Sequence, residues 1–195
     1  MKKRVITISR EFGSGGRYIG QKLAEQLGYA FYDGEIIAKV ASETGFSKEF
    51  VEQNGEYSPR KTLFSYAFVG RDSHGLSVED RLYEAQVNIV LDLAKKGNCV
   101  IVGRCADYIL RDREDCFHVF IHGTKQEKAK RIATLYHMTE TDALKRMKEM
   151  DKKRSIHYNY YTDRKWGDVK NYEITLNSGV LGVEKCIEIL AFACK

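Results

Sequence analysis

A glycine-rich segment near the N-terminus, Gly13-Ser14-Gly15-Gly16-Arg17, constrains the fold of this chain more than any other feature. The apolar run Ile6-Thr7-Ile8 precedes it and a helical pattern follows it, so we expect the segment to join a buried strand to a helix. Glycines permit positive φ angles, which let successive backbone N–H groups converge on an anion. The N-terminus of the following helix favours negative charge at the same place. The segment therefore predicts a phosphate-binding loop, with Arg17 placed to neutralise phosphate oxygens.

The loop departs from the usual phosphate-binding pattern, Gly-x-x-x-x-Gly-Lys-Ser/Thr. With Arg17 at the lysine position, Glu11 stands where the first glycine belongs, and Tyr18 stands where the Mg²⁺-holding hydroxyl belongs. The alternative interpretation is a glycine-rich turn that binds no ligand. The strand–loop–helix context favours a phosphate ligand.

Short runs of β-branched and aromatic residues are typical of strands buried on both faces of a sheet. They lie at residues 4–8, 99–102, 117–121 and 172–176, with a shorter fifth candidate at 30–32. Helical patterns separate them, and capping signals at Ser77, Thr124 and Thr139 mark helix starts. This alternation predicts an α/β fold of three α/β/α layers, with a parallel sheet of about five strands.

One interval, from about residue 35 to 97, is too long for a single crossover and is mostly helical by pattern. We interpret it as a helical lobe over one edge of the site, inserted in a single domain that spans residues 1–195. Ligands of such folds bind at the carboxyl ends of the strands. Residues 9–17, residues 103–107 and the loop after Ile121 are expected at that edge.

The bulk composition is that of an ordinary globular protein. No apolar run approaches the roughly 20 residues of a membrane span, so we expect a cytoplasmic protein without membrane contact. The five cysteines show no Cys-x-x-Cys spacing, which favours buried thiols in a reducing compartment. The net charge of +5 suits a phosphate-binding protein and equally a plain solvated surface.

Charged residues follow two of the other predicted strands. Arg104 and Asp107 come directly after the strand at 99–102, where they either face a ligand or cap the next helix and form a salt bridge. Asp33 follows the short strand at 30–32 and is a candidate either for a substrate contact or for the N-cap of the next helix.

A basic stretch that contains Lys152 and Arg154 is expected to end a helix. The segment 151–168 is then interpreted as a flap that folds over a triphosphate. The alternative for the charged residues is a solvated face. The aromatic residues of the segment either stack on a base, hold the flap down by packing, or form a subunit contact.

The chain resembles the cytidylate-kinase-like proteins, a branch of the nucleoside monophosphate kinases within the P-loop fold. Four strings spread over nearly the whole chain carry the resemblance: residues 6–17, Phe31-Tyr32-Asp33, residues 100–107, and Lys165-Trp166-Gly167-Asp168 with Tyr172. Cytidylate kinases have Asp-Gly-Arg-Asp after their third strand. Here the string is Val102-Gly103-Arg104-Cys105, so Arg104 matches and the two aspartates do not.

The resemblance implies phosphoryl transfer from ATP with Mg²⁺. It implies that ATP contacts Phe12, Gly13, Ser14, Gly15, Gly16, Arg17 and Tyr18. It implies catalytic roles for Arg17, Arg104, Lys152, Arg154 and Asp33, and acceptor binding by Asp33, Arg104 and Asp107. The Mg²⁺ ligands and the oligomeric state stay open, a homodimer included.

Four hypotheses follow. The first is a nucleoside monophosphate kinase, with CMP or dCMP as the acceptor. The second is a P-loop kinase of another small molecule, which the two lost aspartates favour. The third is a nucleotide-binding sensor with little or no transfer, favoured by the missing lysine and hydroxyl. The fourth and least favoured is binding of nucleic acid through the basic helix at 145–154, which predicts a basic stripe along one face and an affinity that falls steeply with salt.

Overall fold

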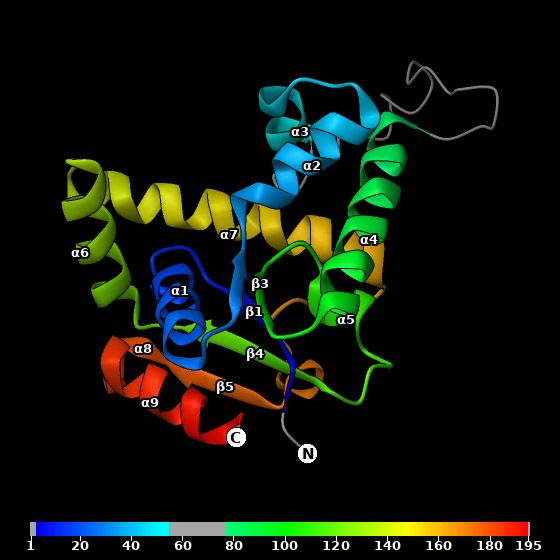
Figure 1. Ribbon diagram of the computed structural model, residues 1–195. Helices are drawn as coiled ribbons and strands as arrows, with labels where there is room; N and C mark the ends of the chain where they lie inside the picture. The colour runs from blue at the N-terminus through cyan, green and yellow to red at the C-terminus, as the bar shows by residue number, and fades with distance from the viewer. Residues whose placement is uncertain (1–2, 55–76, 195) are drawn as a thin grey trace.

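The computed structural model describes residues 3–54 and 77–194 of the chain (Figure 1). Within them, five parallel strands form one sheet in the order β2-β3-β1-β4-β5. The strands are β1 (Val5–Arg10), β2 (Ala30–Tyr32), β3 (Cys99–Val102), β4 (Cys116–His122) and β5 (Ile174–Asn177). The helices are α1 (Gly16–Leu27), α2 (Gly34–Thr44), α3 (Lys48–Asn54), α4 (Val78–Lys96), α5 (Ala106–Ile109), α6 (Lys125–Tyr136), α7 (Glu140–Thr162), the 3₁₀ helix η2 (Val169–Asn171), α8 (Ser178–Leu181) and α9 (Val183–Ala193). The predicted α/β fold is confirmed.

The sheet is apolar on both faces, as the unbroken hydrophobic runs predict. Ile6 and Ile8 of β1 point to the side covered by α1 and α9, which lie next to each other (Figure 1). Val5 and the β3 residues Cys99 and Ile101 belong to the core under α2, α4 and α5. Because successive side chains of a strand alternate between faces, a central strand buried on both sides needs apolar residues throughout. Three layers result.

Two strand boundaries differ from the prediction by two residues, and the others by one residue at most. β1 continues through Ser9 and Arg10, because both pair with β4 in parallel register, opposite Phe120 and Ile121. The polar side chains of Ser9 and Arg10 hide this extension in the sequence. The last strand begins at Ile174, because residues 169–171 form η2.

The helix starts follow their capping signals. The Ser77 hydroxyl accepts a hydrogen bond from the Asp80 N–H, and the Ser77 N–H donates one to the Asp80 carboxylate, which completes a capping box at the start of α4. Thr124 and Thr139 cap α6 and α7 by accepting from the N–H groups of Glu127 and Asp142.

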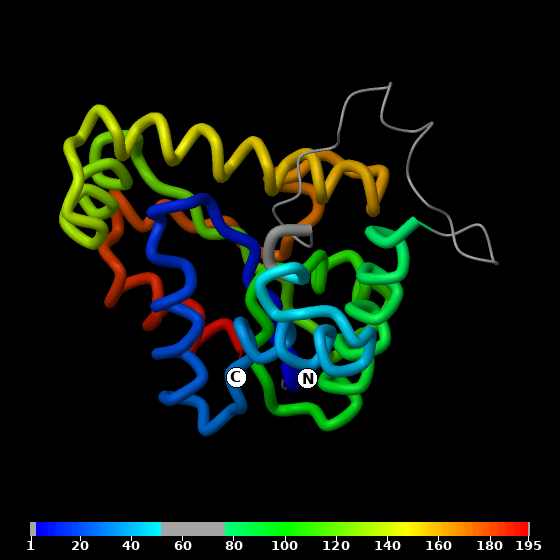
Figure 2. The backbone as a smooth tube through the Cα atoms, turned by 90° about the horizontal axis from the view of Figure 1, so that it is seen from above, coloured from blue at the N-terminus to red at the C-terminus, as the bar shows by residue number. Residues whose placement is uncertain are grey.

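The predicted helical interval from 35 to 97 contains α2, α3 and α4, and residues 55–76 of it lie outside the described residues. The expectation that a helix ends near Arg154 is wrong, because α7 continues to Thr162. Figures 1 and 2 both show α7 crossing the molecule from α6 toward α4. The first two thirds of the predicted flap, residues 151–162, are therefore the C-terminal half of a long helix.

Candidate functional site

The glycine-rich segment forms the predicted turn between β1 and α1. Gly13 and Gly15 have φ angles of +82° and +79°, and Gly15 is the N-cap residue of α1. A Cβ on Gly13 would lie 2.6 Å from the Ile132 Cδ1 atom, so α6 packs directly on the loop. Only glycine meets both requirements, a left-handed backbone and a contact this close.

One side chain of the loop itself and two from distant segments hold the loop. The buried Ser14 donates its hydroxyl to the Glu11 carbonyl at 2.8 Å. Ser178, the first residue of α8, donates to the Ser14 carbonyl at 2.5 Å. Arg131 of α6 donates to the Gly13 carbonyl at 2.8 Å, and its guanidinium lies 3.2 Å from where a Cβ of Gly15 would be. A cation that the sequence pattern did not indicate thus lies beside the loop.

The first residue of the predicted cradle has another role. The Phe12 N–H donates to the Asp151 carboxylate at 2.6 Å, so that N–H group points to α7. The buried Lys128 lies 2.8 Å from the Glu11 carboxylate and 3.7 Å from that of Asp151. Burial raises the pKa of Asp151, and its hydrogen bond from Phe12 and its nearness to Lys128 and Arg154 work against that rise. The acidic residue at the first-glycine position is thus neutralised by a lysine from α6.

Arg17 and Asp33 are brought together as an ion pair. The Arg17 Nε atom lies 2.7 Å from the Asp33 Oδ2 atom, and 71% of the Arg17 side chain is exposed. Asp33 stands at the N-cap position of α2, but its carboxylate makes no capping hydrogen bond. The pair therefore links the start of α1 to the start of the helical lobe, and Tyr18 beside it is half exposed.

Three buried arginines surround one small cavity at the carboxyl ends of β1 and β3. We call it the arginine cavity; it is lined by Ser9, Arg10, Gly103, Arg104, Cys105, Arg154, His157, Tyr158 and Trp166. Arg10, Arg104 and Arg154 are each less than 9% exposed. The Arg154 Nη1 atom donates to the Arg10 carbonyl at 3.2 Å, and a Cβ on Gly16 would lie 2.6 Å from the Arg10 Cβ atom. Arg10 is thus shared between the arginine cavity and the loop.

Arg104 sits on a strained turn. Gly103, Arg104 and Cys105 have φ angles of +72°, +62° and +53°. For the two non-glycine residues this conformation costs on the order of 1–2 kcal/mol each, and such strain concentrates at functional sites. Gln86 of α4, which is buried, donates to the Arg104 carbonyl at 3.1 Å. The turn after β3 is therefore fixed from the helical lobe.

Asp107 lies behind the arginine cavity and is 3% exposed. Its carboxylate accepts hydrogen bonds from the Ser9 hydroxyl at 3.2 Å and from the Tyr158 hydroxyl at 2.6 Å. Burial raises the pKa of Asp107, and these hydrogen bonds and the nearby His118 work against that rise. The carboxylate binds two residues of the protein where a substrate contact was expected.

The predicted site residues therefore fall into separate places. Arg104 and Arg154 meet in the arginine cavity, Arg17 and Asp33 meet at the edge of the lobe, and Lys152 is exposed on α7. Lys152 and Arg154 are two positions apart on a helix, which places them on different faces. Trp166 packs edge-to-face on Phe120 with ring centroids 5.4 Å apart, in agreement with the packing alternative.

Several contributing residues were missed by the sequence reasoning. They are Arg10, Gln86, Lys128, Arg131, His157 and Tyr158. Gln86 gives one usable signal, because it is a polar residue on the apolar face of α4. The others come from positions that only the tertiary fold brings together.

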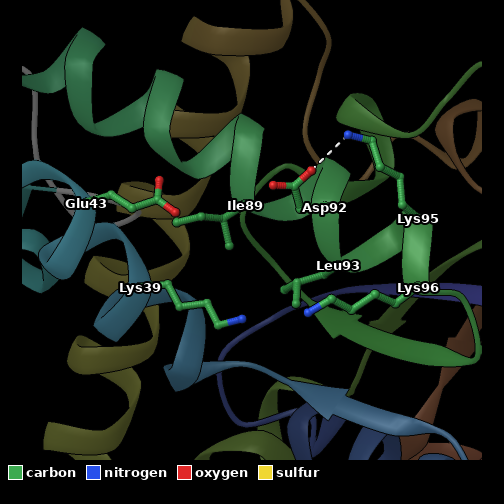
Figure 3. A pocket seen from close by; sticks show the side chains of 7 residues that line it. All are labelled: Lys39, Glu43, Ile89, Asp92, Leu93, Lys95 and Lys96. Carbon is green, nitrogen blue, oxygen red and sulfur yellow. Dashed lines mark hydrogen bonds and ion pairs between the residues drawn. The ribbon is translucent and has the colours of Figure 1, made fainter.

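A larger, open cavity lies between α2 and α4. Its lining is Lys39, Glu43, Ile89, Asp92, Leu93, Lys95 and Lys96 (Figure 3). Lys95 pairs with Asp92 at 2.9 Å. The cavity shares no residue with the loop or the arginine cavity.

Other classes of feature add little to the site. In the part of the chain that the structure describes, no three His, Cys, Asp or Glu side chains are grouped to hold a metal ion. Nor does any helix of that part have both the length and the apolar composition needed to cross a bilayer. All five cysteines are free and buried, as predicted, and burial raises the pKa of Cys99 to about 11.

A model of the cytidylate kinase-like family matches residues 5–180. A cytidylate kinase from Ignicoccus hospitalis is 23% identical over 188 residues, which cover 95% of this chain and 96% of that protein.

Solved structures agree on the fold. The crystal structure of an uncharacterized protein from Eubacterium ventriosum is 30% identical, covers 98% of both chains and superposes with a TM-score of 0.75. A shikimate kinase from Bacteroides thetaiotaomicron is 16% identical, covers 97% of both chains and has a TM-score of 0.55, a likeness of fold alone.

Proposed function

The chain belongs to the cytidylate kinase-like family, and we propose that it transfers the γ-phosphoryl group of ATP to a nucleoside monophosphate. The name of the Ignicoccus relative supports CMP or dCMP as the acceptor. The observation that carries the proposal is the arginine cavity beside the glycine-rich loop. Three buried arginines line one small space, which favours an anionic ligand, and a phosphate matches the forked donors of guanidinium groups.

The residues of the loop fit the phosphates of ATP. The left-handed Gly13 and Gly15 turn the backbone ahead of the first turn of α1, where N–H groups and the helix dipole favour an anion. Arg131 adds a guanidinium at the same place. Because the Phe12 N–H donates its hydrogen bond to Asp151, the N–H groups that bind the phosphates of ATP begin at Gly13.

The residues do not fit a protein-held Mg²⁺ ion. Tyr18 replaces the usual hydroxyl residue, and the nearby carboxylates of Glu11 and Asp151 are engaged by Lys128 and the Phe12 N–H. Mg²⁺ would therefore arrive bound to ATP as its counter-ion, without a ligand from the protein.

The reaction is a direct transfer between two anions. An oxygen of the acceptor's phosphate, held by Arg10, Arg104 and Arg154, attacks the γ-phosphorus of ATP. The bond from that phosphorus to the bridging oxygen of the β-phosphate breaks, and ADP leaves with its electron pair. The protein contributes position and positive charge. Arg10 supports this geometry because it borders both the loop and the arginine cavity.

One observation favours a second candidate, a nucleotide sensor with little transfer. The Arg17 side chain pairs with Asp33 and is largely exposed, whereas the proposed catalytic role places it at the migrating phosphoryl group. Catalysis by Arg17 therefore requires this pair to open when ATP binds. A sensor would need only this opening of the Arg17–Asp33 pair, passed on through α2, and no phosphoryl transfer.

ADP release from ATP·Mg²⁺ tests the two candidates across a panel of nucleoside monophosphates and small alcohols. We expect turnover on CMP or dCMP, reduced about 100-fold or more in Arg17→Ala, since a donor aimed at transition-state charge contributes about 3–4 kcal/mol. Arg111→Ala is the matched control, because Arg111 also pairs with an aspartate, Asp112, away from the loop.

The other outcomes separate the alternatives. Thermal stabilisation by ATP without turnover on any acceptor would contradict the kinase proposal and leave the sensor. Turnover on an alcohol but on no monophosphate would indicate a kinase of another small molecule.

A further inference from the structure

We propose that Asp107 is a positioning residue that sets the three arginines of the arginine cavity through hydrogen bonds to Ser9 and Tyr158. The inference rests on the proposed function only for the identity of the anion that the cavity binds.

The carboxylate of Asp107 is anchored at both oxygens. Its Oδ1 atom accepts from the Ser9 hydroxyl at 3.2 Å and its Oδ2 atom accepts from the Tyr158 hydroxyl at 2.6 Å. The two partners belong to β1 and α7, and Asp107 itself lies in α5. Asp107, Ser9 and Tyr158 are all at least 95% buried. A buried carboxylate with both oxygens engaged fixes the relative placement of the segments that it joins.

Each of these three segments carries one arginine of the cavity. Ser9 directly precedes Arg10 in β1. Tyr158 follows Arg154 by four positions, about one turn along α7. Asp107 follows Arg104 by three positions, just beyond the strained turn after β3. One carboxylate is thus tied to the three pieces of backbone from which the guanidiniums project.

The arrangement has a physical reason. Three guanidiniums around one small cavity repel one another, and arginine side chains have high rotamer entropy. The hydrogen bonds of Ser9 and Tyr158 to the Asp107 carboxyl group hold the segments in place before the anion arrives. An anion then binds without having to order the site.

Tyr158→Phe tests the proposal, because it removes one hydroxyl and keeps the ring. Tyr29→Phe is the matched control: Tyr29 is also buried and donates one hydrogen bond, to the Lys3 carbonyl at 2.9 Å, but it lines none of the cavities described above. The probe is inorganic phosphate, titrated against the full chain by calorimetry, with NMR signals of the arginine Nε–H groups as a second readout. Thermal unfolding of each variant shows that it folds.

We expect Tyr158→Phe to weaken phosphate binding by roughly tenfold or more, because small misplacements of binding groups have large effects. It should also shift the arginine Nε–H signals of the cavity, while Tyr29→Phe changes neither. The effect of Tyr158→Phe should be smaller in an Arg154→Lys background, since Tyr158 acts through Arg154 in part.

Three results would overturn the proposal. They are wild-type phosphate affinity in Tyr158→Phe, full additivity with Arg154→Lys, and the absence of phosphate binding by the wild-type chain. Phosphate binding that depends on Tyr158, without turnover on any acceptor, would leave this inference standing and contradict only the kinase reaction.

Discussion

The glycine-rich loop and the arginine cavity are neighbours that differ in construction. The loop is one continuous segment, and the groups that we propose to bind phosphate there are those of the backbone. The arginine cavity is assembled from residues about 90 and 50 positions apart, and its chemistry belongs to side chains. Arg10 is the residue where the two meet.

The difference separates two kinds of sensitivity. A backbone site tolerates changes of side chain as long as the φ angles and the close contacts are kept. A side-chain site depends on each guanidinium and on the residues that hold it. The chain matches the family model although Arg17 and Tyr18 replace the usual lysine and hydroxyl residue of the loop. This agrees with a loop that depends on its backbone more than on its side chains.

The largest effect should come from removing a cavity arginine. We expect Arg104→Met to lower kcat/KM for CMP by about 1000-fold, near the upper end for loss of one transition-state donor. Arg104→Lys, which keeps the charge and loses the forked donors, should fall between this variant and the wild type. Equal rates for Arg104→Met and the wild type would show that the arginine cavity does not hold the acceptor.

A second effect concerns the cation that balances Glu11. Lys128→Met leaves the carboxylates of Glu11 and Asp151 without their ammonium partner. We expect a loss of about 2–3 kcal/mol in the free energy of unfolding, less than for a fully buried pair because both carboxylates are partly exposed. Lys152→Met is the control on α7, where an exposed lysine should change stability by no more than about 0.5 kcal/mol. Similar losses in urea denaturation for both variants would contradict this role of Lys128.

A smaller effect tests the backbone character of the loop. Gly13→Ala places an alanine in a left-handed backbone conformation and brings its Cβ atom into a clash with Ile132. Gly28→Ala has the same backbone strain, but its Cβ atom would contact nothing. We expect the free energy of unfolding, measured by thermal unfolding, to fall by about 2–3 kcal/mol in Gly13→Ala and by about 1 kcal/mol in Gly28→Ala. Equal losses would mean that the contact between the loop and α6 adds nothing.

The same contrast decides what the sequence could predict. The strands, the loop and the capping box at Ser77 are local patterns, and the structure confirms them. The residues of the arginine cavity are distant in sequence, so local patterns indicate only some of them. Arg104 is indicated because it directly follows a predicted strand. Arg10 is not indicated, because it lies inside β1.

The length of α7 was misjudged because the charged stretch at 151–154 resembles a solvated end. The helix continues because Arg154, Tyr158 and Thr162, spaced by four, form a buried stripe. Tyr158 reaches Asp107 because it belongs to that stripe, and Lys128 reaches Glu11 because α6 packs on the loop. Neither contact has a sequence signal of its own.

The central claim is that the loop and the arginine cavity form the two halves of one site. Calorimetry with an adenosine–cytidine bisubstrate, the two nucleosides joined by five phosphates, tests it most directly. We expect the wild-type chain to bind this compound about 100-fold or more tightly than ATP, and Arg104→Met to lose most of that gain. A bisubstrate affinity no greater than that of ATP, or a gain unchanged in Arg104→Met, would contradict the claim.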